Sequence, residues 1–350
     1  LKEYHIDGFR FDLSKGFTQN NTLGDVGGWG NYDLSRVNNI KRIYNEVKAV
    51  NPNAYLILEH FSDNSEEKDL ANYGCMFWGN LNNDAMESSM GYNSSFDWGN
   101  HQSRGWNSPK VIAYAQSHDE ERMMYKNLQY GNVSGSYSIK DFNTALDRLE
   151  LTWVVFNSIP GPKLIWQFGE LGYDYSIDYN GRVGNKPIKW EYNTASNRKD
   201  VYRVFSEINK LKTNYEAFDG NDFSTNLSGK VKRVQLNHPD QNFLILGNFD
   251  VVEQSVAPNF NHKGIWYEYF SGDSMDVFDL ASEISLFQGE YQIWTDKKIQ
   301  TDQDIGGVEN PFLGIKIYPN PVIEDITISS NDGPVSSYEI IDSQGRILSN

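Results

Sequence analysis

Residues 6–16 read IDGFRFDLSKG, and the interpretation of the whole chain starts from this stretch. In an extended strand, Gly8, Arg10 and Asp12 lie on one face, while Phe9 and Phe11 lie on the other. A guanidinium and a carboxylate at the end of an apolar strand do not fit an ordinary core, because burying either group unpaired costs several kcal/mol. The spacing alone is equally compatible with a structural ion pair and with a functional site.

Residues 1–215 alternate apolar strands with helical patterns. Such alternation predicts a parallel sheet covered by helices. Polar residues cluster just after each strand, which is typical of a (β/α)8 barrel and, less specifically, of any open α/β sheet. We expect strands at residues 6–12, 54–59, 74–80, 111–119 and 163–168, helices at 36–50, 142–157 and 198–212, and a polar loop after residue 59.

The pattern changes after residue 215. Residues 216–300 contain short strands separated by turn residues, which predicts a small all-β domain. Residues 301–311 read as a polar linker, and residues 312–350 begin a third, strand-rich unit. The strands expected in the all-β domain are residues 231–236, 242–249, 265–270, 275–278 and 289–294.

The composition narrows the classes of partner. Among 350 residues, 31 Lys and Arg stand against 47 Asp and Glu, giving a net charge of −16. This charge argues against nucleic acid and anionic membranes as partners and suits a neutral substrate, although solubility alone explains it equally well. The single cysteine, Cys75, excludes an internal disulfide, and no apolar run is long enough to span a membrane.

Three acidic residues, Asp12, Glu59 and Asp119, each follow an apolar strand. The carboxyl ends of parallel strands meet at one rim, so these residues can converge although they lie far apart in sequence. Cleavage of a glycosidic bond needs one carboxylic acid to protonate the leaving oxygen and one carboxylate to attack or to activate water. Arg10 would keep Asp12 ionised, as a nucleophile must be, and Glu59 looks less paired and therefore better suited to donate a proton.

The segments IDGFRFDLSK, LILEH and SHDEER resemble the second, third and fourth short motifs of the α-amylase family of glycoside hydrolases, in the right order. The resemblance covers residues 1–300. It implies a (β/α)8 catalytic barrel, of which residues 1–215 would be the part from about the fourth strand onward, followed by a β-sandwich domain at residues 216–300.

Position by position, the resemblance implies a role for each matching residue. Asp12 matches the nucleophile, Glu59 the general acid/base, and Asp119 the third acid, which stabilises the transition state. Arg10 matches the arginine that orients the nucleophile, and His118 matches a substrate-contacting histidine. The implied activity is that of a retaining α-glucan hydrolase, which cleaves α-1,4 bonds in starch or glycogen through a covalent glycosyl-enzyme.

The sequence departs from the family pattern at two motifs. Where the family has Lys-His, this chain has Lys15-Gly16; calcium is the cofactor that the resemblance suggests, and this departure counts against it, while Lys15 stays a substrate-binding candidate. His60 either touches sugar or packs inside. Ser117, with Asp-Glu after its histidine, resembles branching enzymes. A branching or debranching enzyme and an inactive surface glycan-binding protein therefore remain alternatives.

The family's first motif and its lid domain are not found in this sequence, which begins with Leu1 at what resembles the fourth barrel strand. We therefore expect a fragment. Because a barrel that lacks strands has open sheet edges, this piece made alone should fold poorly and hydrolyse nothing. Soluble, active protein expressed from these residues would contradict that expectation.

The last residues carry a second resemblance. YPNP at residues 318–321, followed by DITIS and SYEIIDSQGRIL, is similar to the start of the C-terminal sorting domain of the type IX secretion system of Bacteroidetes. This resemblance implies recognition by that secretion machinery and export to the cell surface or the medium. The alternative is an ordinary β module that binds glycan or packs on its neighbour.

Overall fold

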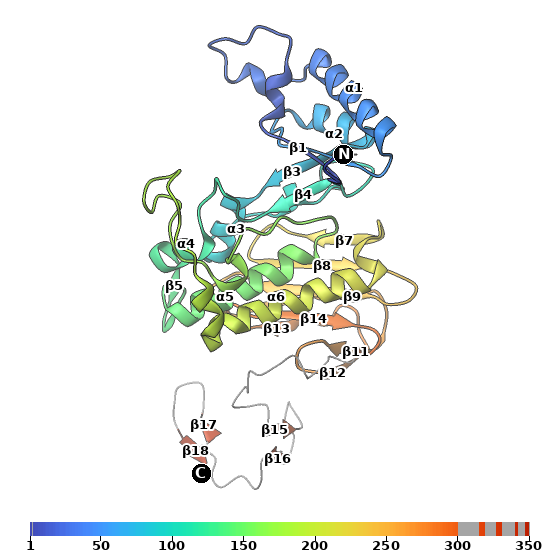
Figure 1. Ribbon diagram of the computed structural model, residues 1–350. Coiled ribbons are helices and arrows are strands. Elements are labelled where there is room, and N and C mark those ends of the chain that lie inside the picture. Colours follow the sequence, from blue (N-terminus) through green and yellow to red (C-terminus); the bar gives the residue numbers. More distant parts are fainter. Residues whose placement is uncertain (2, 300–314, 319–326, 331–339, 342–346, 350) are drawn as a thin grey trace. The chain divides into compact units, whose positions relative to one another are not determined.

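The computed structural model describes residue 1, residues 3–299, and, as backbone only, residues 315–318, 327–330, 340–341 and 347–349. The chain divides into two compact units, Leu1–Gln300 and Thr301–Asn350 (Figure 1). All of the candidate site residues belong to the first unit.

A four-stranded parallel sheet forms the first part of this unit, with the order β1-β2-β3-β4. The predicted parallel sheet with alternating helices is thereby confirmed, and closure into a partial barrel stays a prediction. The strands are β1 (Gly8–Phe11), β2 (Tyr55–Leu58), β3 (Met76–Asn80) and β4 (Val111–Tyr114). The helices are α1 (Leu34–Val50), α2 (Asn64–Tyr73), α3 (Asn82–Ser89), α4 (Met123–Tyr130), α5 (Phe142–Ser158) and α6 (Ser196–Asn214), and a small hairpin is formed by β5 (Val133–Ser134) and β6 (Tyr137–Ser138).

Gly8 shows why the first strand begins as it does. A Cβ at this position would lie 2.2 Å from the carbonyl oxygen of Tyr55, so only glycine allows β1 to approach β2 at their paired ends. The register then runs Arg10 opposite Ile57 and Phe11 opposite Leu58. This register brings the residues that follow the two strands side by side.

The prediction of a strand at residues 163–168 is wrong for all but its first residue. The structure has a single parallel bridge, between Lys163 and Ala113. Beyond it the chain turns away, because Phe168 adopts the left-handed conformation (φ 61°) and Gly169 donates a hydrogen bond back to the Trp166 carbonyl (3.0 Å). The apolar run KLIWQF therefore supplies side chains to the sheet end without continuing the ladder.

The prediction of a polar loop after residue 59 is wrong as well, because residues 64–73 form α2. Four of its residues are buried, and two of them are Glu66 and Glu67. Each buried glutamate is paired with an arginine from elsewhere in the chain, Glu66 with Arg36 and Glu67 with Arg104. These tertiary ion pairs occupy positions where a helical pattern would normally show apolar residues.

An aspartate cap fixes the start of α1. The Asp33 carboxylate accepts hydrogen bonds from the backbone N–H groups of Ser35 (2.9 Å) and Arg36 (3.3 Å), as an N-cap does. Burial alone would raise the pKa of Asp33, but these bonds and those from the Ser35 and Thr18 hydroxyls lower it to about 2. The cap therefore stays ionised throughout the physiological range.

The second part of the unit is an antiparallel six-stranded sheet with the order β12-β11-β14-β9-β8-β7, accompanied by the pair β10-β13. This confirms the predicted all-β part after residue 215, although three short strands, β7, β10 and β13, were not expected. The strands are β7 (Phe223–Asn226), β8 (Val231–Leu236), β9 (Phe243–Asn248), β10 (Gln254–Val256), β11 (Gly264–Glu268), β12 (Ser274–Val277), β13 (Ile284–Leu286) and β14 (Tyr291–Thr295).

Strand β9 lies between two hydrophobic cores. Phe243 and Ile245 join the large core that the sheet shares with the helices, whereas Leu244 and Leu246 join the smaller core inside the all-β part. The two sets alternate along the strand, as residues on opposite faces must. The all-β part is therefore packed against the helices through one continuous core within the first unit.

Helix α5 lies directly on β9, next to α6 (Figure 1). A Cβ on Gly247 would meet side-chain atoms of Leu151 and Val155 at 2.5 and 2.7 Å, so glycine permits this close approach. Arg148 of the same helix is fully buried and donates to the main-chain carbonyls of Ser89 (2.9 Å) and Phe249 (2.7 Å). These contacts tie the end of α3, the middle of α5 and the end of β9 together.

Glu150 makes the contact between α5 and β14 sensitive to pH. Tyr291 donates a hydrogen bond to Glu150 (2.8 Å), and burial, with the nearby charges of Asp147 and Asp200, raises the pKa of Glu150 to about 8. A carboxyl whose folded pKa is raised contributes stability that is complete below its unfolded pKa and is lost as the pH rises through the folded value. Stability should therefore fall between about pH 4.5 and about pH 8.

We expect Glu150→Gln to remove much of this dependence, because a neutral amide still accepts the Tyr291 hydroxyl and never ionises. At pH 8 the variant should gain about 1–3 kcal/mol in the free energy of unfolding relative to the wild type, and at pH 5 it should gain little. Glu150 borders an open cavity of about 630 Å³, so solvent reduces the gain below what full burial would give. Urea denaturation of the full-length protein at both pH values measures it, with the exposed Glu253→Gln as control. If the free energy of unfolding changed equally with pH in Glu150→Gln and in the wild type, the expectation would be contradicted.

In the second unit the described residues form two antiparallel pairs, β15 (Ile315–Tyr318) with β16 (Thr327–Ser330) and β17 (Ile340–Ile341) with β18 (Ile347–Ser349). The predicted linker at residues 301–311 and the proline-containing part of YPNP lie outside the described residues. The sorting-domain resemblance stays a prediction.

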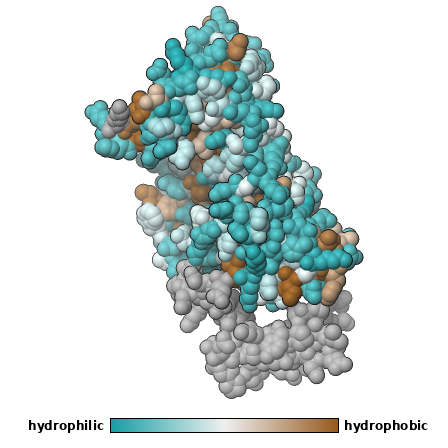
Figure 2. Space-filling view, turned by 90° about the vertical axis from the view of Figure 1, so that its right-hand side faces the viewer, coloured by the Kyte–Doolittle hydropathy of each residue, from teal (hydrophilic) through white to brown (hydrophobic). Residues whose placement is uncertain are grey.

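The face shown in Figure 2 is dominated by hydrophilic residues, and its hydrophobic residues form small separate groups. In the part of the chain that the structure describes, no helix is long and apolar enough to cross a membrane.

Candidate functional site

The candidate site begins where β1 and β2 end. Arg10, the third residue of β1, contacts the Asp12 carboxylate through Nη1 (2.5 Å) and the Glu59 carboxylate through Nη2 (2.8 Å). Asp12 is the first residue after β1, and Glu59 is the first residue after β2. One guanidinium therefore lies between the two carboxylates that the sequence singled out.

The two carboxylates differ in exposure. The Asp12 side chain is 77% exposed, whereas that of Glu59 is 12% exposed. The expectation that Glu59 is the less paired acid is wrong, since its Oε2 contacts Arg10 and also accepts a hydrogen bond from the Leu13 N–H (3.0 Å). No local sequence pattern indicates this pairing, because the Arg10 contact crosses from one strand to the next. The contact between Arg10 Nη2 and Glu59 Oε2 has the geometry of an ion pair and not of a hydrogen bond.

The chain reversal after β1 holds the backbone of Glu59. Leu13 adopts the left-handed conformation (φ 37°), which costs a non-glycine residue energy and is tolerated where the surroundings fix it. This turn points the Leu13 N–H at the Glu59 carboxylate, and the Ser14 N–H at the Glu59 carbonyl (2.7 Å). The Glu59 N–H in turn donates to the Phe11 carbonyl (3.0 Å), so both sides of this acid are fixed.

The third acid lies in the loop after β4. The Asp119 side chain is 61% exposed and lies 3.1 Å from Nε2 of His118. Arg122, which is buried, donates to the Ser117 carbonyl (2.8 Å) and holds the loop from inside. His118 and Asp119 thus lie in contact in the loop, four and five residues beyond the end of β4.

An aromatic group connects the two halves of the site. Trp78, on β3, lies under the Arg10 guanidinium at 4.0 Å and is 6.0 Å from the His118 ring. The His118 ring also lies 5.7 Å from Trp166, which follows the last bridge of the sheet. A guanidinium over an indole face is attracted by the ring and kept in place. Arg10, with its two acids, is thereby linked across β3 to His118 and Asp119.

Tyr114 supports the same conclusion electrostatically. It is buried at the end of β4, with its ring 5.5 Å from Trp78. Burial raises the pKa of Tyr114, and the charges of Glu120, Glu59 and Asp119 raise it further. The charges of Glu59, after β2, and of Glu120 and Asp119, after β4, therefore all act on the one Tyr114 phenol.

The structure places His60 inside the protein and away from solvent, which favours packing over sugar contact. It is fully buried, with Nδ1 2.8 Å from the Ser14 hydroxyl and Nε2 2.6 Å from the Glu66 carboxylate. Because a carboxylate only accepts, Nε2 donates to Glu66, while Nδ1 shares a hydrogen bond with the Ser14 hydroxyl. Both ring nitrogens are thereby used inside the protein.

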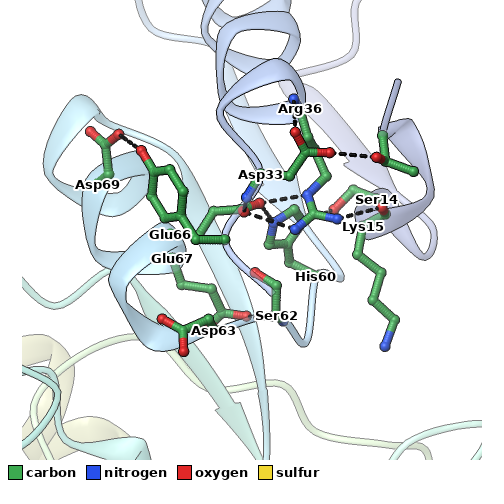
Figure 3. Close-up of polar contacts among 12 residues, drawn as sticks. Ser14, Lys15, Asp33, Arg36, His60, Ser62, Asp63, Glu66, Glu67 and Asp69 are labelled. Atoms are coloured by element: carbon green, nitrogen blue, oxygen red, sulfur yellow. Dashed lines mark hydrogen bonds and ion pairs between the residues drawn. The ribbon is translucent and has the colours of Figure 1, made fainter. Parts of the chain in front are cut away.

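Figure 3 shows the network to which His60 belongs. Arg36 forms a two-pronged pair with Glu66, at 2.6 and 2.8 Å, and donates to the carbonyl of Lys15 (2.8 Å). The Lys15 side chain itself extends away from the network in this view. Lys15 therefore contributes its backbone to the support of the site, while its ammonium group is left as the substrate-binding candidate that the sequence suggested.

Other site neighbours gave no sequence signal. Trp166 and Tyr114 lie in apolar runs that predict core strands, and Asn80 pairs with Glu120 (2.6 Å) across the ends of β3 and β4. Arg182 donates to the Asp119 carbonyl (2.5 Å) from a loop far along the chain. Its position as the last residue of β3 could have suggested Asn80, whereas the other three depend on tertiary contacts.

Within the described residues, no group of three or more His, Cys, Asp and Glu side chains is arranged to hold a metal ion. The calcium suggested by the family resemblance stays a prediction, because calcium also takes backbone carbonyl and water oxygens as ligands.

No model of a known protein family matches this sequence, and no curated protein matches it. Solved structures match its fold. AmyP in complex with maltose shares 13% identity over 84% of this chain and 64% of its own, with a TM-score of 0.60. The α-amylase of Geobacillus thermoleovorans, complexed with acarbose, shares 15% over 84% and 60%, with a TM-score of 0.59. The pullulanase of Bacillus acidopullulyticus shares 18% over 84% and 38%, with a TM-score of 0.59.

These matches establish that the chain has the fold seen in α-amylases and a pullulanase. The chain spans less than two thirds of the length of each of those three proteins. A shared fold does not fix activity, so the function has to be argued from the site itself.

Proposed function

We propose that this chain is part of a retaining α-glucan hydrolase of the α-amylase type, which cleaves α-1,4 bonds in starch or glycogen. The observation that carries the proposal is the position of Arg10 between Asp12 and Glu59, at the ends of neighbouring parallel strands. Two-step glycoside cleavage needs two carboxyl groups, and Asp12 and Glu59 follow neighbouring strands. The third acid, Asp119, lies on the other side of Trp78.

In the first step, Asp12 attacks the anomeric carbon as the glycosidic bond breaks, and Glu59 gives its proton to the leaving oxygen. In the second step, Glu59 takes a proton from water, the water oxygen attacks the anomeric carbon, and Asp12 is released. Asp119 and His118 would bind sugar hydroxyls beside the reacting ring. A retaining enzyme of this kind requires the Asp12 and Glu59 carboxyl groups to lie about 5–5.5 Å apart.

The shared arginine fits this cycle. Before the first step Asp12 is anionic and Glu59 is protonated; after it, Asp12 is a neutral ester and Glu59 is anionic. Arg10, which contacts both carboxylates, is therefore next to one negative charge at each stage. A fixed cation that serves both stages avoids the cost of rearranging charge during the reaction.

The test is incubation of the full-length protein with amylose, followed by reducing ends and iodine colour. A hydrolase raises the number of reducing ends as the colour fades. A branching enzyme changes the colour without raising them. Starch binding without turnover would support the inactive glycan-binding protein. A protein that shows no turnover and no starch binding would contradict all three proposals.

A branching or debranching enzyme is the second candidate, because the motif SHDEE carries Ser117 and Glu120 around the third acid. Glu120 pairs with Asn80 at the end of β3 (2.6 Å), and the Ser117 hydroxyl accepts a hydrogen bond from the Asp119 N–H (3.2 Å), so both residues contact the site region.

We also propose that the protein is exported to the cell surface or the medium by a type IX secretion system. The residues after 314 support this by their sequence, and the strand pairs β15-β16 and β17-β18 lie in the same region. Deleting everything after residue 314 from the full-length protein, in a host with this system, should leave the protein inside the cell. Unchanged export would contradict the proposal.

A further inference from the structure

Residues 178–186, DYNGRVGNK, form a compact loop that we call the Arg182 loop. Its turn is built on Asn180 and Gly181, both in the left-handed conformation (φ 58° and 78°). The Lys186 ammonium donates to the carbonyls of Gly181 (2.8 Å) and Gly184 (2.7 Å) from within the loop. The loop therefore carries its own internal hydrogen bonds and does not depend on a long strand or helix for its shape.

Three hydrogen bonds attach this loop, or the residues just before it, to residues 117–122, which carry the third acid and which we call the Asp119 segment. Arg182 donates through Nη2 to the main-chain carbonyl of Asp119 (2.5 Å). Just before the loop, the hydroxyl of Ser176 (2.7 Å) and the N–H of Ile177 (2.8 Å) donate to the Glu121 carboxylate. The contacts reach residues 119 and 121, so the loop lies against the outer side of the Asp119 segment.

The Asp119 segment is held from inside as well, by the buried Arg122 bonded to the Ser117 carbonyl. The Asp119 side chain itself is 61% exposed, so its direction depends on the backbone that carries it. Arg182 is the outer of two arginines that fix this backbone. Removing it leaves the inner one in place and frees the outer side.

The residue next to Arg182 has unusual exposure. The Val183 side chain is 100% exposed, so it packs against nothing in the free protein. A single exposed apolar residue needs no explanation by itself. Val183, however, lies on a loop held in shape by hydrogen bonds from Lys186, and it immediately follows Arg182, which contacts Asp119. An apolar surface in that place can be covered by the apolar face of a sugar ring.

We propose that the Arg182 loop forms a wall of the substrate site, in which Arg182 is a positioning residue for Asp119 and Val183 contacts the α-glucan chain beside it. This inference rests on the proposed function, since it takes the α-glucan of that reaction as the ligand.

The test uses the full-length protein and titrates maltoheptaose calorimetrically into a Glu59→Gln background, which separates binding from turnover. Arg182→Ala should weaken binding ~10-fold, and Arg182→Lys should recover part of it, because an ammonium can still donate to the Asp119 carbonyl. Val183→Asp should weaken binding ~3–10-fold without changing the unfolding temperature, since its side chain supports no packing. Arg42→Ala and Val252→Asp, two exposed residues outside the loop, should bind as the parent does.

Unchanged affinity for maltoheptaose in both Arg182→Ala and Val183→Asp would overturn the proposal that the Arg182 loop forms a wall of the substrate site. The same substitutions with Glu59 restored should raise KM for amylose more than they lower kcat, whereas a purely structural role would lower the unfolding temperature and leave KM unchanged. A protein that binds maltoheptaose but never cleaves amylose overturns the proposed hydrolase while the titration still decides the wall. A parent that binds no maltoheptaose overturns both.

Discussion

Glu59→Gln in the full-length protein should lower kcat on amylose ~10²–10⁴-fold, because an amide cannot give a proton to the leaving oxygen. The loss should be much smaller with α-maltosyl fluoride, since fluoride leaves without being protonated. The substitution keeps the shape of the side chain, and the amide oxygen can still accept the Leu13 N–H. Rates on the two substrates, measured under saturation, give the comparison.

Asp12→Asn separates the two roles. A missing nucleophile should lower kcat by at least ~10⁴-fold on amylose and on the fluoride alike, because the glycosyl-enzyme cannot form from either. Glu216→Gln and Asp240→Asn change exposed acids in the same chemical way and should leave both rates intact. A near-normal rate on amylose in either site variant would refute the assignment. Equal losses on both substrates for Glu59→Gln would refute its role as proton donor.

The helices that sequence patterns predicted are those with a stripe of buried apolar residues, even where a buried arginine accompanies it. Helix α1 buries Val37 and Ile40, and α5 buries a long series of apolar side chains, so their periodicity is visible. Helix α2 buries Glu66 and Glu67 in half of its core positions, which erases the apolar signal. Its place in the fold is set by Arg36 and Arg104, whose pairing with these acids no local pattern announces.

The site divides in the same way. The three acids could be singled out as candidates because each comes after an apolar strand, which is visible in local sequence. What lies around them was not found, because it depends on which strands are neighbours. Arg10 contacts Glu59 only because β1 pairs in parallel with β2 in one register, and His60 turns inward because Ser14 and Glu66 converge on it. Arg182 lies 63 residues from the acid whose carbonyl it holds.

The buried network behind the candidate site also helps to hold its geometry. Glu66 holds His60, His60 contacts the Ser14 hydroxyl, and that hydroxyl lies 3.0 Å from the Glu59 carbonyl. The chain of contacts runs from α2 to the backbone of the proposed acid/base. A polar network of this kind fixes positions more strictly than apolar packing does, provided that each member is paired.

Glu66→Ala should lower the free energy of unfolding by about 3–5 kcal/mol, because it leaves the Arg36 guanidinium buried without its carboxylate partner. Both side chains are almost entirely buried, at 1% and 0% exposure, so water cannot replace the lost contact. The Asp33 N–H, which donates to Glu66 (2.7 Å), also loses its acceptor. Urea denaturation of the full-length protein at pH 7 measures the change, and Glu46→Ala, on the exposed face of α1, should have little effect.

The pH dependence gives the second half of this test. Burial alone would raise the pKa of Glu66, but hydrogen bonds from His60, Arg36 and the Asp33 N–H lower it below its ordinary value of 4.5. A carboxyl with a lowered folded pKa contributes stability that is present above the unfolded pKa and is lost as the pH falls through the folded one. The advantage of the wild type over Glu66→Gln should therefore be complete at neutral pH and shrink below about pH 4.5. An advantage that stays constant down to acid unfolding would show that Glu66 stabilises the fold by packing and not by its charge.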